Sequence, residues 1–395
     1  MENQLRVWLR YSFVFGLYMS PTQETQYIHR RVTPNKRLAW RERKRILQQA
    51  HLKTFYMYIL LVGLCVVFVR ALASRKPIPG IASEVVTTTI FSLQALSSLI
   101  VAAEGLCCQQ QQETFLRILQ EIEFSLKLRL REDIKLDILP SRVRWLLKYL
   151  LWLSLICFGM AVYNFRQLQH LGYYWYSIGY SIIIRLRIIQ LCVYVCVLRN
   201  YLECLCMKLQ QLVAYRTAPN QQLLDINYEK LQSLEYLRDI KHVYDLLYKA
   251  FEQLNEFAGW SLFAIITCYL LDYGCTLYFA LLSWEGYLES CSYYVPGFWW
   301  LVPMTAIIWH ICYMCHDCKQ LDRLLATNLR RIIIMSSSQP KFSYRILLQQ
   351  FATQLELQCI EVTARNFFVL DLGLLMSILA SVSSYMVMLI QFLYI

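Results

Sequence analysis

Polar side chains in a strongly apolar stretch near the C-terminus are the first candidates for chemistry. They are spaced four, three, four and three residues apart, which places them on one stripe of a helix. Hydroxyl and amide groups can hydrate ions, so the stripe could line a pore if several copies of the helix surrounded one axis. The alternative is a helix–helix contact, because small residues allow close packing in membranes. The stripe consists of Ser377, Ser381, Ser384, Met388 and Gln391.

Ionisable side chains inside other apolar stretches form a second candidate site. Arg185 and Arg187 lie in the middle of one stretch, and Asp272 lies near the middle of another. Charged groups are costly in lipid and are usually paired or functional. Counting residues from the ends places Arg185 and Asp272 at comparable depth, which favours a structural ion pair; a ligand site or gating switch is the alternative. Glu84 and Glu104 lie near the ends of a stretch, where we expect them to reach water.

Aromatic residues gather toward one side of the expected membrane. Some of them suit an interfacial aromatic belt. The others could line a pocket between helices, since aromatic walls with a few polar groups bind small organic molecules. The predicted ligand pocket combines aromatic and charged residues: Tyr163, Tyr176, Tyr180, Arg185, Asp272, Tyr278, Trp299 and Trp300.

A group of cysteine and histidine residues matches a cofactor pattern in spacing only. Cys312-Tyr-Met-Cys315-His316 has the spacing of a c-type haem attachment site, with Cys318 nearby. Haem attachment needs an oxidising compartment, and a zinc site needs a second ligand pair. We therefore predict no metal and no cofactor. Hydrolase and nucleotide-binding motifs are absent from the sequence, which argues against an enzyme.

The elements that must position these residues follow from the composition. Apolar residues make up 57% of the 395 residues and charged residues 17%, against about 45–50% and about 25% in soluble domains. A helical span needs roughly 20 apolar residues, and a β-barrel would alternate in polarity. The sequence predicts an all-α membrane protein with seven spans: Thr54–Ala73, Val85–Leu106, Leu146–Phe165, Tyr173–Leu198, Phe257–Leu282, Phe298–Cys315 and Phe367–Ile395.

The distribution of positive charge predicts the orientation. Only Arg75, Lys76 and Arg166 of the 39 Lys and Arg residues fall in the predicted outer loops. The positive-inside rule therefore places the N-terminus in the cytoplasm and the C-terminus outside, the reverse of G-protein-coupled receptors. The net charge of +12 then reflects flanks facing anionic lipid, and we expect no nucleic-acid partner.

Long polar segments on the cytoplasmic side have helical periodicity and are expected to extend the spans. This organisation predicts four regions. They are a cytoplasmic N-terminal segment (1–53), six spans with cytoplasmic helical extensions (54–315), a cytoplasmic anchor segment (316–366) and a pore-lining last helix (367–395).

Three sequence stretches resemble the insect gustatory receptor family. Its closing signature is Thr-Tyr, five mainly apolar residues and Gln-Phe. Here Ser384-Tyr385 precedes five apolar residues and Gln391-Phe392, so that serine replaces threonine and keeps the hydroxyl. The stretch from Thr363 to Asp371 and the stretch Phe15-Gly16-Leu17-Tyr18-Met19-Ser20-Pro21 are also similar to that family.

The resemblance implies a ligand-gated, nonselective cation channel in the plasma membrane of a chemosensory neuron. It also implies a tetramer, either of identical chains or with related receptors. Gln391 and Phe392 would form the pore constriction, and the ligand pocket would open outward among the middle spans. A bitter compound is the default tastant and a sugar the next. A secondary transporter using Arg185 and Asp272, or a G-protein-coupled type of receptor, is the alternative.

Overall fold

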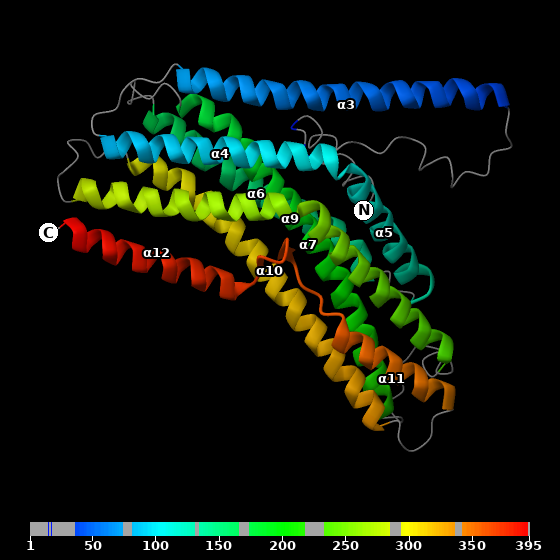
Figure 1. Cartoon of the computed structure of the whole chain (residues 1–395). Helices are drawn as coiled ribbons and strands as arrows, with labels where there is room; N and C mark the ends of the chain where they lie inside the picture. The colour runs from blue at the N-terminus through cyan, green and yellow to red at the C-terminus, as the bar shows by residue number, and fades with distance from the viewer. Residues whose placement is uncertain are drawn as a thin grey trace.

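The computed structural model describes residues 15, 17, 36–73, 81–130, 134–165, 174–217, 233–284, 294–335 and 342–393. These residues form nine helices and one small hairpin (Figure 1). Their bounds are α3 (Lys36–Ala73), α4 (Ile81–Cys107), α5 (Gln109–Leu128), α6 (Ile134–Phe165), α7 (Tyr174–Thr217), α9 (Leu234–Trp284), α10 (Tyr294–Met335), α11 (Phe342–Leu357), β1 (Thr363–Ala364), β2 (Phe368–Val369) and α12 (Leu372–Leu393).

The predicted all-α membrane architecture is confirmed. Five helices in the described part of the chain are long and apolar enough to cross a membrane. Each carries one of the first five predicted spans, the fourth of them from Tyr174 onward. The sixth predicted span lies within α10, and the seventh coincides with most of α12, whose described apolar part is Leu372–Met388. Most of the predicted N-terminal segment (1–53) lies outside the described residues, and its described helical part belongs to α3.

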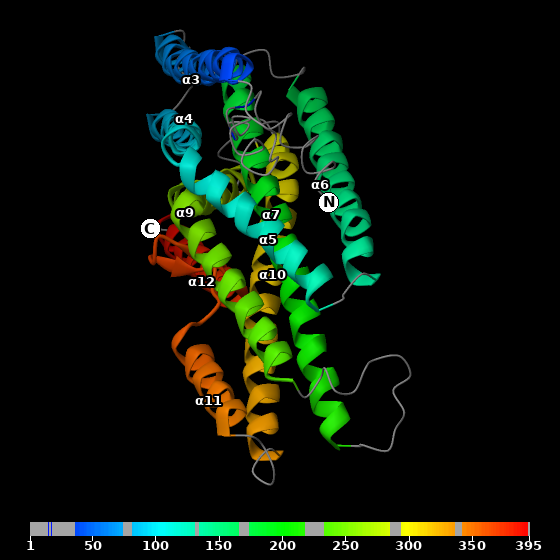
Figure 2. The ribbon, with the colours of Figure 1, turned by 90° about the vertical axis from the view of Figure 1, so that its right-hand side faces the viewer.

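Helix α7 is the centre of the bundle. In an 18-residue apolar window within Ser177–Ala214, 89% of the residues are buried. The helix packs against α4, α6, α9 and α10. The corresponding windows of α3 and α6 are only 11% and 18% buried. Figures 1 and 2 show these two helices at the periphery. Their exposed Val, Leu and Ile side chains suit contact with lipid tails.

Three helices are much longer than a membrane is thick. Helices α7, α9 and α10 have 44, 51 and 42 residues, whereas about 20 residues cross the hydrocarbon core. Their ends beyond the spans lie side by side at the lower right of Figure 1, where α11 packs against α9 and α10. The expected helical extensions of the spans are therefore present.

The last helix begins later than the sequence analysis predicted. Residues from Phe367 to Asp371 belong to the β1–β2 hairpin and its exit, and α12 starts at Leu372. Arg365 and Asn366 have positive φ angles of 48° and 61°, which reverse the chain. Asp371 then accepts a hydrogen bond from the backbone N–H of Leu374 at 3.0 Å, so it caps the new helix.

Candidate functional site

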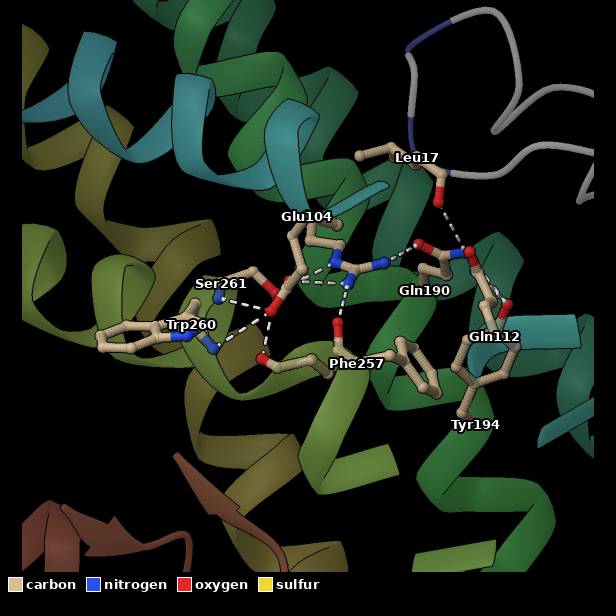
Figure 3. Close-up of polar contacts among 10 residues, drawn as sticks. Leu17, Glu104, Gln112, Gln190, Tyr194, Phe257, Trp260 and Ser261 are labelled. Carbon is tan, nitrogen blue, oxygen red and sulfur yellow. Dashed lines mark hydrogen bonds and ion pairs between the residues drawn. The ribbon is translucent and has the colours of Figure 1, made fainter. Parts of the chain in front are cut away.

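A buried ion pair lies where α4, α7 and α9 meet. Arg187 Nη2 donates to Glu104 Oε2 at 2.9 Å, and the two side chains are 1% and 3% exposed. The other carboxylate oxygen, Oε1, accepts hydrogen bonds from the backbone N–H groups of Trp260 (3.1 Å) and Ser261 (3.3 Å). Figure 3 shows the Trp260 ring pointing away from Glu104 while its backbone nitrogen faces the carboxylate. The buried carboxylate therefore has three hydrogen-bond donors from the protein itself, as a buried polar group requires.

The guanidinium group of Arg187 is almost fully satisfied. It donates to Ser261 Oγ at 3.1 Å, to the carbonyl oxygen of Phe257 at 3.2 Å and to Gln190 Oε1 at 3.0 Å, besides the bond to Glu104. Its centre also lies 5.7 Å from the centroid of the Phe257 ring. Such a fixed set of donors and acceptors specifies one arrangement of the three helices.

A chain of hydrogen bonds extends this network toward the N-terminal segment. Gln190 Nε2 donates to the hydroxyl of Tyr194 at 3.0 Å and to the carbonyl oxygen of Leu17 at 3.5 Å. Gln112 Nε2 on α5 also donates to Tyr194, at 3.3 Å. Leu17 is fully buried. Leu17, which belongs to the N-terminal stretch that resembles gustatory receptors, is therefore linked to the buried pair through Gln190 (Figure 3).

The buried pair coincides with a break in the regular path of α9. Figure 1 shows this helix changing direction near its middle. Side-chain groups of Glu104 and Arg187 bond there to backbone N–H and C=O groups of Phe257, Trp260 and Ser261. Insertion of side chains into the backbone ladder is a recognised cause of helix bending. The ion pair thus fixes the bend from outside the helix.

Two members of this site differ from their predicted surroundings. Glu104 was expected to reach water near a helix end, but it is 6% exposed because α5 continues beyond α4 and both helices pack on α9. For Arg187 the sequence predicted only that the residue lies within a span. The spacing did contain a signal. Arg187 follows Arg185 by two residues, and such residues point to opposite sides of a helix, so the two side chains must have different neighbours.

Arg185 and Asp272 lie in a separate polar cluster. Arg185 is 6% exposed. Asp272 is partly buried, lies within electrostatic reach of Arg185 and accepts a side-chain hydrogen bond from Gln94 on α4. The other polar atom of Gln94, Oε1, is buried and has no hydrogen-bond partner among the described residues. Three helices, α4, α7 and α9, thus contribute polar groups to this cluster.

The structure describes the side chains of three aromatic residues of the predicted ligand pocket, and their burial differs. Tyr180 is 1% exposed, and its hydroxyl donates to the carbonyl oxygen of Leu64 at 2.8 Å, with its ring edge against Phe91. Tyr163 on α6 is 67% exposed, and Tyr278 on α9 is partly buried. The side chains of Tyr176, Trp299 and Trp300 lie outside the described residues.

The cysteines of the haem-like spacing pack into the interior. Cys312, Cys315 and Cys318 are buried free thiols, and His316 Nε2 is 2.9 Å from Gln320 Nε2. Within the described ranges no three His, Cys, Asp or Glu side chains converge as a metal site would require.

A polar cluster also fixes the segment between α11 and the hairpin. Asp322 on α10 accepts hydrogen bonds from the hydroxyl of Tyr244 at 3.2 Å and from the backbone N–H of Ile360 at 3.4 Å. The hydroxyl of Tyr244 also contacts the carbonyl oxygen of Gln358 at 2.8 Å. Burial raises the pKa of Asp322 to about 6, although the two hydrogen bonds oppose the shift.

The polar stripe of α12 faces away from its own bundle. Leu375, Ile378 and Val382 are 5–7% exposed and pack against the core. At 100° per residue the stripe lies on the opposite side of the helix. Its members Ser377, Ser381, Ser384, Met388 and Gln391 are all exposed. The side chain of Phe392 lies outside the described residues.

The family model described as "7tm Chemosensory receptor" matches residues 5–394, almost the entire chain. The chain belongs to this family of chemosensory receptors. The predicted resemblance is thereby confirmed, and the family consists of multi-pass membrane receptors rather than enzymes.

Two curated relatives and two solved structures agree with this assignment. Gustatory receptor 39b of Drosophila melanogaster is 26% identical over 226 residues, which are 56% of this chain and 59% of that protein. Gustatory receptor 23a of the same species is 29% identical over 170 residues, 41% of this chain and 43% of that protein. The chain therefore matches less than two thirds of the length of each relative.

The structural comparison extends over almost all of both chains. The insect olfactory receptor OR5 from Machilis hrabei has a TM-score of 0.62 at 14% identity, and the alignment covers 98% of each chain. The structure of OR5 in complex with eugenol gives a TM-score of 0.61 with the same identity and coverage. At this identity the comparison establishes a shared fold.

Proposed function

We propose that this chemosensory receptor is a ligand-gated, nonselective cation channel that assembles as a tetramer and opens in response to a small-molecule tastant. Its place would be the plasma membrane of a chemosensory neuron. The tetramer would consist of identical chains or include related receptors. The observation that carries the proposal is the position of the polar stripe on α12.

The hydroxyl groups of this stripe point away from their own bundle, so they need a polar partner from outside it. Lipid tails cannot solvate polar groups, whereas water in a pore can. Ser377 Oγ donates to the carbonyl oxygen of Gly373 at 3.0 Å, and Ser381 Oγ donates to that of Ser377 at 2.8 Å. These bonds use the hydroxyl protons, so the oxygen lone pairs remain free to coordinate cations. Four copies of the stripe around one axis would form a continuous hydrophilic wall.

The constriction of this pore is assigned to Gln391 and Phe392 near the outer end of α12. An amide beside an aromatic ring can close a narrow pore through dewetting and reopen it after a small rotation. Gln391 is exposed on the same side of the helix as the serines. Met388 would lie one turn below, between the constriction and Ser384.

The tastant site is assigned to the polar cluster of Gln94, Arg185 and Asp272. The unpartnered Oε1 of Gln94 and the partly buried carboxylate of Asp272 are acceptors. They suit a ligand that donates hydrogen bonds, such as an amine or a hydroxyl compound. Bitter alkaloids are the first class to test and sugars the second. The complex of the related OR5 fold with eugenol supports a small organic ligand.

Whole-cell recording tests the function. Cells expressing the full chain would be exposed to quinine, caffeine and sucrose, and we expect an inward cation current with at least one of them. Gln391→Ala should change the conductance or the ion selectivity, whereas Val382→Ala, on the face packed against the core, should leave both unchanged. Currents that Gln391→Ala leaves unaltered would remove the gate assignment. Ligand-coupled flux without channel currents would favour a transporter instead.

A further inference from the structure

The segment that connects the cytoplasmic anchor to the pore helix is fastened mainly to α9. Asn255 on α9 bonds to this segment on both of its side-chain atoms. Its Nδ2 donates to the carbonyl oxygen of Glu361 at 2.9 Å, and its Oδ1 accepts from the backbone N–H of Thr363 at 2.9 Å. The Asn255 amide thus pairs with the backbone of this segment through one donated and one accepted hydrogen bond.

A second attachment occurs one helical turn further along α9. Gly259 has no side chain at the point where Arg365 crosses the helix. A methyl group at Gly259 would lie 2.8 Å from Arg365 Cγ and 3.0 Å from its backbone nitrogen. The guanidinium carbon of Arg365 lies 5.8 Å from the centroid of the Trp260 ring, a distance typical of a cation–π contact. Glycine is therefore required here by close approach of another backbone.

Aromatic rings extend this attachment across the turn of the hairpin. Phe263 on α9 lies 4.9 Å from the ring of Phe367 and 6.1 Å from that of Phe368. Trp260 also approaches Phe367, at 6.4 Å. These separations fall in the range of favourable aromatic pairs. The hairpin therefore rests on the part of α9 that begins at its bend.

The hairpin is in turn continuous with the pore helix. The backbone N–H of Leu370 donates to the carbonyl oxygen of Val362 at 2.8 Å and closes the hairpin. Asp371 directly follows and caps α12 through Leu374. Lys319 on α10 holds the same segment through Glu361 at 2.7 Å. We define residues 361–371 as the clasp.

We propose that the clasp couples α9 to the pore helix and that Arg365, seated against Gly259 and Trp260, is the positioning residue of this coupling. Glu104 bonds to the backbone of Trp260 on one side of α9, and the clasp grips the other side through the ring and through Gly259. A shift of α9 at its bend is then transmitted to the inner end of α12. The inference rests on the proposed channel function and adds the route by which the gate is reached.

Gly259→Ala tests the coupling with a single methyl group, and Gly274→Ala is the matched control. Gly274 lies on the same helix, and a methyl group there meets no atom within 4 Å. Hydrogen exchange of the full-length protein in lipid nanodiscs reports on the clasp without any ligand. We expect amides in residues 361–374 to exchange about tenfold faster in Gly259→Ala, because overpacking of this size displaces one neighbour. Gly274→Ala should match the wild type.

Three further variants separate coupling from simple loss of structure. Arg365→Ala in the Gly259→Ala background removes two of the three close contacts of the new methyl group and should restore part of the protection. Currents evoked by quinine, caffeine or sucrose, normalised to surface protein, should fall in Gly259→Ala and in Arg365→Ala. They should recover in Arg365→Lys, which keeps a cation over Trp260.

The outcomes distinguish this inference from the function on which it rests. If the wild type conducts and Gly259→Ala behaves like Gly274→Ala in both exchange and current, the coupling is wrong. If exchange rises in the clasp but the first turn of α12 and the currents stay unchanged, the clasp is only structural and the coupling is again wrong. If the wild type carries no current, the proposed channel function fails, and the gating role of Arg365 fails with it.

Discussion

Removing the charge of Glu104 is the perturbation for which the structure gives the clearest magnitude. Glu104→Gln keeps the shape of the side chain and one acceptor oxygen. It leaves Arg187, which is 1% exposed, without its counter-ion. Breaking a buried ion pair in this way costs about 3–5 kcal/mol, because the remaining charge stays buried.

An exposed ion pair of similar length provides the control. Arg330 Nη2 lies 2.8 Å from Glu356 Oε1, and these side chains are 64% and 58% exposed. Surface pairs contribute about 0–1 kcal/mol. Glu356→Gln should therefore lower the free energy of unfolding by less than about 1 kcal/mol. The distance is similar in both pairs, so the difference between the two variants measures the effect of burial.

A double variant completes the experiment. Replacing both Glu104 and Arg187 by Gln removes the two charges together and leaves amides that can bond to each other. The single variants Glu104→Gln and Arg187→Gln are measured beside it. We expect the double variant to lose less free energy of unfolding, by at least about 1 kcal/mol, than the sum of the losses in the two single variants. The assay is equilibrium unfolding of the full-length protein in mixed detergent micelles. Additive single effects, or a loss in Glu104→Gln as small as in Glu356→Gln, would refute the view that the pair holds α4, α7 and α9 together.

Three other predictions concern different parts of the molecule. Asp322→Asn should raise the free energy of unfolding at pH 7.5 by about 1–3 kcal/mol, since the folded pKa of about 6 lies above the ordinary value and the charged form opposes folding. That advantage should shrink as the pH falls through 6 toward 4, because the wild-type carboxyl becomes protonated; a difference independent of pH would contradict the assignment. Ser384→Cys should make the current sensitive to a cationic thiol reagent, whereas Val382→Cys, which is 5% exposed, should match the wild type; equal inhibition of both would contradict the pore face. Gln94→Leu should weaken the response to an amine tastant more than it changes surface expression, measured as the half-maximal concentration, and an unchanged value would remove Gln94 from the ligand site.

The architecture was predictable because it depends on long apolar runs. A membrane requires about 20 apolar residues per helix, and the runs around Thr54, Val85 and Leu146 signal spans without any knowledge of their neighbours. The helical extensions were predictable for a similar reason, since their apolar residues recur every three or four positions. The polar stripe of α12 also follows from spacing alone.

Pairing between helices was not predictable from one sequence. Arg185 and Arg187 lie at nearly the same depth in one predicted span. Arg187 binds Glu104 because its side of α7 is the one that meets α4 and α9 at this level. The start of α12 was missed because apolar residues continue through Phe367 and Phe368. The signals were present in the turn residue Asn366, which tolerates a positive φ, and in Asp371, a preferred capping residue.

An electron cryomicroscopy structure of the full-length protein assembled in lipid nanodiscs would show whether α12 lines a pore. We expect four chains around one axis. In each chain the α12 face that carries Ser377, Ser381, Ser384 and Gln391 should line a central water-filled path, with Leu375, Ile378 and Val382 turned into the protomer. A monomer, or an assembly in which the serine face of α12 contacts lipid, would contradict the account.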